Sequence, residues 1–172
     1  MTLRSSAAIS AEMLPAIAEI GVLKARYCRF IDTKRWEDLR SLFVEDAKFE
    51  GLGSAPQGAN LDMFINGISA RFAQATSVHH CHMPDIVLTG ADRARGTWAM
   101  MDYVQWPTGF DVAEVPGHPG FFGYGYYEEE YARRDGLWKI SFLRLTRIRF
   151  DALPPGHPEP RPGKLQADPR WL

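Results

Sequence analysis

The sequence predicts an α+β fold in which three N-terminal helices pack against one face of a curved antiparallel sheet. Two patterns indicate it. Before Thr76, apolar residues recur at three- and four-residue steps, which is typical of helices with one buried stripe. After Thr76, long segments rich in aromatic and β-branched residues follow one another between turns, as expected for an antiparallel meander. A chain of 172 residues fits a single domain of this class.

The helical pattern covers residues 10–31 and 61–74, and the first of these stripes includes Tyr27. Thr33 can cap a short second helix, because its hydroxyl can accept from the backbone of the first turn. A first strand is expected over residues 47–52, followed by a loop rich in glycine.

The meander predicts four longer strands, at 77–89, 93–106, 121–134 and 137–150. The last two are joined by Asp135-Gly136, a dipeptide that suits the positive φ angles of a type I′ turn. A longer connection, Pro107–Gly120, separates the middle strands, and segments of this length often serve as a lid or a contact surface. In the strand after it, Gly125 alternates with tyrosines, and a glycine that faces inward would leave room for a ligand above the sheet.

Residues 1–150 are expected to form this domain and residues 151–172 a proline-rich tail. Six of the chain's twelve prolines lie in the tail, so it cannot form a regular helix or a central strand. The tail is expected either to be disordered or to lie over a neighbouring surface, with Trp171 and Leu172 as its anchors.

The composition argues against several classes of partner. With a formal net charge of −1 and no long run of Lys or Arg, the chain has no basic surface for nucleic acid. No apolar stretch approaches the roughly 20 residues needed to cross a membrane. Two cysteines are too few for a disulfide framework, and the N-terminus lacks the apolar core of a secretory signal. We therefore expect a cytoplasmic protein.

Asp32 is the first candidate for chemistry. It ends the first helix, where its charge meets the negative end of the helix dipole, so local helix stability gives no reason for it. One interpretation is a solvated carboxylate beside Lys34 and Arg35. The other is a carboxylate that orients a histidine and stabilises the imidazolium as it forms.

The cluster His79-His80-Cys81-His82 is the second candidate. In a strand, His79 and Cys81 face one side and His80 and His82 the other. A zinc site needs ligands that converge on one point, so this alternation argues against a metal. Hydrogen-bonded structural histidines and a catalytic base both stay open, and imidazole suits a base because it exchanges protons near neutral pH.

Arg144 lies in the last strand, and the side chains expected on the same face of that strand are mostly apolar. A guanidinium embedded there would need an anionic or carbonyl partner from the protein or a ligand. The alternative is a stem that lies along the sheet with its head in water. Tyr127 belongs to the aromatic residues that crowd the strands, and one or two of these could line a pocket.

Several segments, taken in order, resemble one family. They are the helix end from Tyr27 to Asp32, the Trp36–Asp46 stretch, Ser77-Val78-His79 and the Tyr131–Lys139 segment. Over roughly residues 10–150 the chain resembles the SnoaL-like branch of the nuclear-transport-factor-2-like superfamily. It is most similar there to the cofactor-free group of scytalone dehydratase, hexachlorocyclohexane dehydrochlorinase and bile-acid 7α-dehydratase.

This resemblance implies a cone-shaped barrel with the site inside it, and an aspartate that orients a histidine acting as general base. Matched residue by residue, the aspartate is Asp32 and the histidine is His79, with His80 as the second choice. A pocket tyrosine falls on Tyr27.

The resemblance also implies the residues that meet the substrate. A pocket arginine of the last strand falls on Arg144, or less well on Arg147. Phe49 stands where scytalone dehydratase has a tyrosine. The residues expected to line the substrate pocket are Phe49, His80, Tyr127 and Gly125. No cofactor and no metal are implied, the expected ligand is a small hydrophobic molecule, and the expected assembly is a homo-oligomer, either a trimer or a dimer.

The leading hypothesis is therefore a cofactor-independent, dehydratase-like lyase that acts on a small hydrophobic, cyclic substrate. One alternative is a ketosteroid-isomerase-like or polyketide-cyclase-like enzyme that uses the same pocket. Another is a non-catalytic ligand-binding or assembly subunit of the same fold, which predicts that Asp32 and His79 point to different places.

Overall fold

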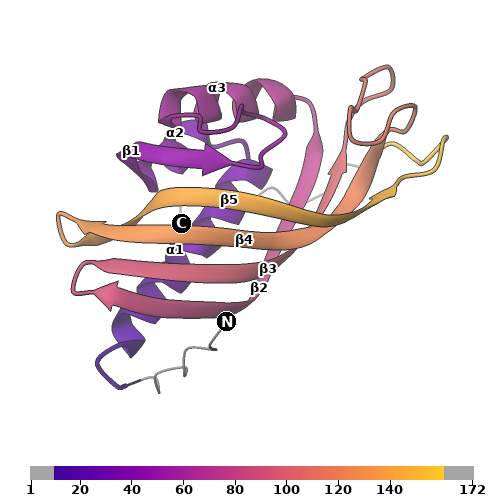
Figure 1. Cartoon of the computed structure of the whole chain (residues 1–172). Coiled ribbons are helices and arrows are strands. Elements are labelled where there is room, and N and C mark those ends of the chain that lie inside the picture. The colour runs from indigo at the N-terminus through magenta and orange to yellow at the C-terminus, as the bar shows by residue number, and fades with distance from the viewer. Residues whose placement is uncertain (1–9, 161–172) are drawn as a thin grey trace.

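The computed structural model describes residues 10–160, which form three helices and one five-stranded sheet (Figure 1). The helices are α1 (Leu14–Asp32), α2 (Trp36–Ser41) and α3 (Leu61–Phe72). The strands are β1 (Phe43–Glu50), β2 (Thr76–Gly90), β3 (Arg93–Gln105), β4 (Gly120–Arg134) and β5 (Leu137–Ala152). The expected α+β class is confirmed, and none of the helices among these residues is long and apolar enough to cross a membrane.

The sheet has the strand order β1-β5-β4-β3-β2. The four long strands form the expected antiparallel meander, while β1 pairs with β5 in parallel. Figure 1 shows the sheet curving around α1, with α3 alongside β1. The core lies between the helices and this inner face of the sheet and consists mainly of aliphatic and aromatic side chains, with the fully buried ion pair of Lys24 and Glu129 among them.

The helix ends depart from the sequence-based expectation around Thr33. The Thr33 hydroxyl donates to the carbonyl of Arg29 at 2.7 Å and so closes α1, whereas α2 has no side-chain cap. The second helix is correspondingly short, and Phe43 belongs to β1, which begins four residues before the expected start at position 47. The cap of α3 is Asn60, whose side chain accepts from the backbone of Met63 at 2.9 Å.

The β4–β5 hairpin forms at the expected dipeptide. Asp135 and Gly136 have φ angles of 51° and 78°, the two positive values that a type I′ turn requires. Register within the hairpin is interrupted twice, once near Ser141 and once near Ile148, where β5 carries an extra residue relative to β4. Each bulge shifts which side chains of β5 face the core.

The segment between β3 and β4 folds back onto the body of the protein. Val112 and Val115 are buried within it, and Trp106 at its start donates its indole N–H to the carbonyl of Arg71 at 2.9 Å. Glu114 of the same segment accepts from the Arg71 side chain at 2.5 Å. The segment therefore ties the end of β3 to the end of α3.

Strand β5 runs to Ala152, two residues past the expected domain boundary. The described part of the tail returns toward β3, since Gln105 donates its side-chain amide to the carbonyl of Pro158 at 3.1 Å. Trp171 and Leu172 lie outside the described residues.

Candidate active site

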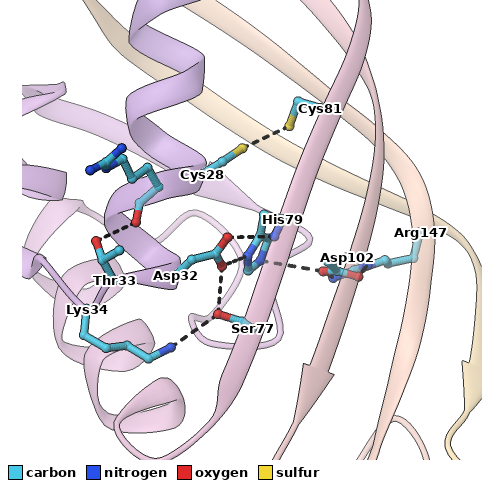
Figure 2. A network of polar contacts seen from close by, with 10 residues as sticks. Cys28, Asp32, Thr33, Lys34, Ser77, His79, Cys81, Asp102 and Arg147 are labelled. Carbon is cyan, nitrogen blue, oxygen red and sulfur yellow. Dashed lines mark hydrogen bonds and ion pairs between the residues drawn. The ribbon is translucent and has the colours of Figure 1, made fainter. Parts of the chain in front are cut away.

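Asp32 and His79 meet between α1 and β2 (Figure 2). Asp32 ends α1, and its Oδ1 lies 2.7 Å from Nδ1 of His79. Its other carboxylate oxygen accepts the backbone N–H of His79 at 2.8 Å. Because a carboxylate only accepts, this contact places the proton of a neutral imidazole on Nδ1 and leaves the lone pair on Nε2. The two side chains are 22% and 5% exposed, so solvent screens the contact weakly.

Further donors hold the Asp32 carboxylate in place. The Ser77 hydroxyl donates to Oδ1 at 2.8 Å, and the Lys34 ammonium in turn donates to the Ser77 oxygen at 3.3 Å (Figure 2). Burial lowers the pKa of Lys34, while the negative charge of Asp32 acts in the opposite direction. Asp32 is therefore an anchored carboxylate rather than a solvated one.

A second carboxylate, Asp102, faces His79 from β3. The strand register places His79 opposite Asp102 and Asp102 opposite Gly123 of β4. The Asp102 side chain is 1% exposed, and its Oδ2 lies 3.8 Å from Nε2 of His79. Arg147 of β5 donates to both of its oxygens, at 2.7 and 2.5 Å. Figure 2 shows the resulting row, which runs from Asp32 through His79 and Asp102 to Arg147.

Gly123 leaves the room that this row needs. A Cβ at this position would lie 2.1 Å from Nη1 of Arg147 and 2.3 Å from Oδ1 of Asp102. The space expected above a glycine of β4 is thus present at Gly123, but the guanidinium occupies it. At Gly125 a Cβ would lie 2.1 Å from the carbonyl oxygen of Thr146, so Gly125 serves close strand packing and does not line the cavity, which corrects the expectation for it.

A cavity of about 50 Å³ lies between the helices and the sheet. Its lining includes His79, Tyr27, Phe72, Phe121, Tyr127, Leu145 and Arg147. Arg71 and Glu114 also line the cavity. Their side chains form an ion pair, and each is about one-fifth exposed. A void of this size holds one or two water molecules, whereas small-molecule sites measure roughly 300–1,000 Å³. A substrate is therefore larger than this void, and part of the cavity wall would have to move to admit it.

Two of the larger hollows lie beside residues considered for the site, and both are open to solvent. A groove of about 490 Å³ between α1 and β2 reaches the outer side of the Asp32–His79 contact. A hollow of about 500 Å³ lies on the outer face of the sheet beside Glu128 and Arg144, and its lining includes neither Asp32 nor His79. The small inner cavity is the better candidate site because His79 and Arg147 both face it.

Tyr27 and Tyr127 both line the cavity, and their rings meet edge to face with centroids 5.7 Å apart. Burial raises the pKa of each hydroxyl well above its ordinary value, and the negative charge of Glu129 adds to the shift at Tyr27. Both hydroxyls consequently stay protonated near neutral pH and can donate a hydrogen bond to a ligand oxygen.

Two residues expected in the pocket lie elsewhere. Phe49 is fully buried and stacks on Phe64 with ring centroids 4.2 Å apart, so it is a core residue and not part of the cavity lining. His80 is exposed on the opposite face of β2, where its ring lies 5.8 Å from that of His82. The alternation within the strand therefore selects His79 as the partner of Asp32.

The expectation for Arg144 is wrong. Its side chain is 46% exposed on the outer face of the sheet, where it donates to Glu128 at 2.6 Å and lies 3.6 Å from Glu50. The bulge near Ser141 is the cause, because it shifts the inward set to Leu143, Leu145 and Arg147. Arg147, the less favoured choice from sequence, is the arginine that lines the cavity.

Asp102 is the residue of this row that sequence reasoning missed. A signal was present, because Asp102 continues an inward-facing series of β3 that includes Met100 and Val104. A single carboxylate in an apolar face needs a partner, and only the register with β4 and β5 supplies it. Within residues 10–160, no group of three or more His, Cys, Asp or Glu side chains could hold a metal ion.

A model of the SnoaL-like domain matches residues 12–144, which is most of the chain. The chain belongs to the SnoaL-like family. No protein of curated function matches the sequence of this SnoaL-like protein.

Several solved structures share its fold. The Rv3472 protein of Mycobacterium tuberculosis, described as of unknown function, is 25% identical with a TM-score of 0.65, over 83% of this chain and 79% of its own. A protein described as a putative scytalone dehydratase from Novosphingobium aromaticivorans is 20% identical with a TM-score of 0.68, over 85% and 97% of the two chains. A hexachlorocyclohexane dehydrochlorinase (LinA type 3) from Novosphingobium barchaimii is 21% identical with a TM-score of 0.68, over 87% and 98%. At these identities the last two comparisons establish the fold alone.

Proposed function

We propose that this SnoaL-like protein is a cofactor-independent lyase that eliminates water, or a comparable leaving group, from a small hydrophobic, cyclic substrate. The observation that carries the proposal is the contact of the Asp32 carboxylate with Nδ1 of His79, which leaves the acceptor lone pair on Nε2 of a residue that lines the cavity. A positioned base of this kind contributes about 10²–10⁴-fold to a rate.

In the proposed reaction, Nε2 of His79 removes a proton from the carbon next to the one that carries the leaving group. The C–H electron pair becomes the new C=C bond, and the leaving group departs with its bonding pair. The proton on His79 then passes to the departing oxygen or halide, so that water or a hydrogen halide is released and the base is regenerated. Asp32 stabilises the imidazolium between these two steps.

The remaining polar groups of the cavity would act on developing negative charge. Tyr27 and Tyr127 offer neutral hydroxyl donors, and the guanidinium of Arg147 supplies a fixed positive charge. Asp102 balances that charge in the resting protein and sets the position of the guanidinium through two hydrogen bonds. In this proposal Asp102 is a positioning residue and Arg147 a catalytic one.

The same base in the same cavity also serves a ketosteroid-isomerase-like or cyclase-like reaction, in which the proton returns to carbon. The non-catalytic alternative predicts that Asp32 and His79 point to different places, and their 2.7 Å contact disagrees with that expectation. The proposal includes a homo-oligomer, a trimer or a dimer, as the working assembly.

The experiment is an incubation with alicyclic β-hydroxy ketones and alicyclic chlorides, followed by mass analysis of the products. The proposal expects loss of water or hydrogen chloride with the native protein and none with Asp32→Asn. A product of unchanged mass would identify an isomerase. Exchange of deuterium from solvent into the substrate carbon, without elimination, would show that His79 removes the proton but that the compound carries a leaving group the protein does not expel. Absence of both reactions across the panel would overturn the proposal.

A further inference from the structure

The two cysteines of the chain lie in contact although 53 positions separate them. The Sγ atoms of Cys28, on α1, and Cys81, on β2, are 3.4 Å apart (Figure 2). These are the only cysteines in the sequence, and both are free thiols. No step of the proposed elimination uses them.

The two cysteines are placed on α1 and β2 in the same way as Asp32 and His79. Cys28 precedes Asp32 by four residues and so lies one turn earlier on the same face of α1. Cys81 follows His79 by two residues and so points to the same side of β2. Figure 2 shows the two contacts as successive links between the same helix and the same strand.

The two thiols differ in their tendency to ionise. The hydrogen bond with Cys28 lowers the pKa of Cys81, burial raises it, and the nearby Lys24 ammonium lowers it again, so that the net shift is downward. That hydrogen bond raises the pKa of Cys28, and burial raises it further. By these directions Cys81 is the thiol that ionises more readily and Cys28 the one that keeps its proton, which suits the two roles in thiol oxidation.

A small oxidant can reach the pair. Both sulfur-bearing side chains line the groove of about 490 Å³ between α1 and β2, which is open to solvent. Cys81 is partly exposed, whereas Cys28 is buried behind it. The more nucleophilic sulfur is thus also the more accessible one.

We propose that Cys28 and Cys81 form an oxidation site that hydrogen peroxide converts into a disulfide between α1 and β2. The Cys81 thiolate attacks the O–O bond of peroxide, gaining an S–OH group and releasing hydroxide. The Cys28 sulfur then attacks the sulfenic sulfur, forming the S–S bond and expelling hydroxide, which leaves as water with the Cys28 proton. Two thiols are oxidised, and one peroxide is reduced to two water molecules overall.

The step requires little movement. The sulfurs approach from 3.4 Å to the S–S bond length of about 2.05 Å, a distance that rotation of the two side chains can supply. The disulfide would close a loop of 53 positions and fix the two elements that carry Asp32 and His79. Stabilisation of this kind raises the melting temperature by roughly 5–15 °C in a protein of this size.

The test uses the reduced full-length protein, treated with hydrogen peroxide and then alkylated with iodoacetamide before intact mass analysis. We expect the product to have lost two hydrogen atoms, to carry no alkyl group and to melt at the higher temperature until dithiothreitol is added. Cys28→Ser should stop at the sulfenic acid of Cys81, which dimedone traps, whereas Cys81→Ser should give no dimedone adduct.

The proposal is overturned if native protein still takes two alkyl groups after treatment with excess hydrogen peroxide. It is equally overturned if oxidation gives only covalent dimers on non-reducing gels. The mass and melting measurements on native protein decide the question even if a serine variant fails to fold.

Discussion

Arg147 on β5 donates to both carboxylate oxygens of Asp102 on β3, across the intervening strand β4. The pair sits on the cavity side of His79, with the Asp102 side chain 1% exposed. A buried carboxylate held in this way depends on its partner, because removal of the guanidinium leaves an uncompensated charge in the interior.

Arg147→Met should therefore destabilise the protein by about 3 kcal/mol, measured by urea unfolding. The matched control is Arg144→Met, which removes the same charge from the outer face of the same strand, where the side chain is 46% exposed, and should change stability much less. Arg147→Met should also abolish turnover, while Arg144→Met leaves it unchanged. If Arg147→Met changes stability and turnover as little as Arg144→Met does, the buried pair contributes to neither.

Asp32→Asn should lower kcat by about 10²–10⁴-fold with the fold intact. The amide keeps the shape of the carboxylate but presents an N–H group toward Nδ1 of His79, which favours the tautomer with the proton on Nε2. Asp38→Asn is the control, because it makes the same isosteric change at a partly exposed ion pair on α2. Near-native activity of Asp32→Asn would contradict the role of Asp32.

His79 and His80 offer a direct comparison of neighbouring residues. His79→Ala should abolish turnover, since it removes the only imidazole that faces the cavity among the described residues. His80→Ala should leave kcat within about two-fold, because the His80 ring is exposed on the outer face of β2. Steady-state kinetics of the two variants check this. A greater loss of kcat in His80→Ala than in His79→Ala would contradict the assignment of His79 as the base.

Three buried tyrosines predict the response to alkaline pH. Burial raises the pKa of Tyr27, Tyr127 and Tyr131 well above the value in the unfolded chain, which is about 10. Their contribution to stability is thus complete below about pH 10 and is lost as the pH rises toward their folded-state pKa values. Absorbance at 295 nm should show these three of the six tyrosines ionising only together with unfolding. Ionisation of all six before the far-ultraviolet signal changes would contradict the burial.

We expect the ion pair of Arg71 and Glu114 to hold the connection between β3 and β4 against the body of the protein. Glu114→Gln removes the charge and keeps the size, so it should weaken closure by about 1 kcal/mol, or about five-fold in the opening equilibrium. Chymotrypsin cleavage after Phe110, in the same segment, should accelerate by a similar factor. Glu37→Gln, at an exposed position of α2, is the control and should cleave at the native rate. Unchanged cleavage in Glu114→Gln would show that the ion pair does not hold the segment.

Much of the site was predictable because its signals are local. Asp32 stood out as a carboxylate at the unfavourable end of a helix. His79 was placed before His80 by the resemblance to a family, and the structure shows that strand alternation puts the two rings on opposite faces of β2. The third site residue, Arg147, was placed second to Arg144 because the bulge near Ser141 has no mark in the sequence. The same bulge placed Arg144 on the outside, where the regular alternation of a strand predicts an embedded residue.

The sequence by itself determined the α+β class, the helical and strand periodicities and the turn at Asp135-Gly136, because each depends on backbone preferences and side-chain spacing within a few residues. Only the tertiary structure decided that Asp102 faces His79 and that Cys28 lies against Cys81. Contacts of this kind depend on strand register and on how a helix lies across a sheet. Both are set by packing between segments dozens of residues apart, and no local pattern encodes them.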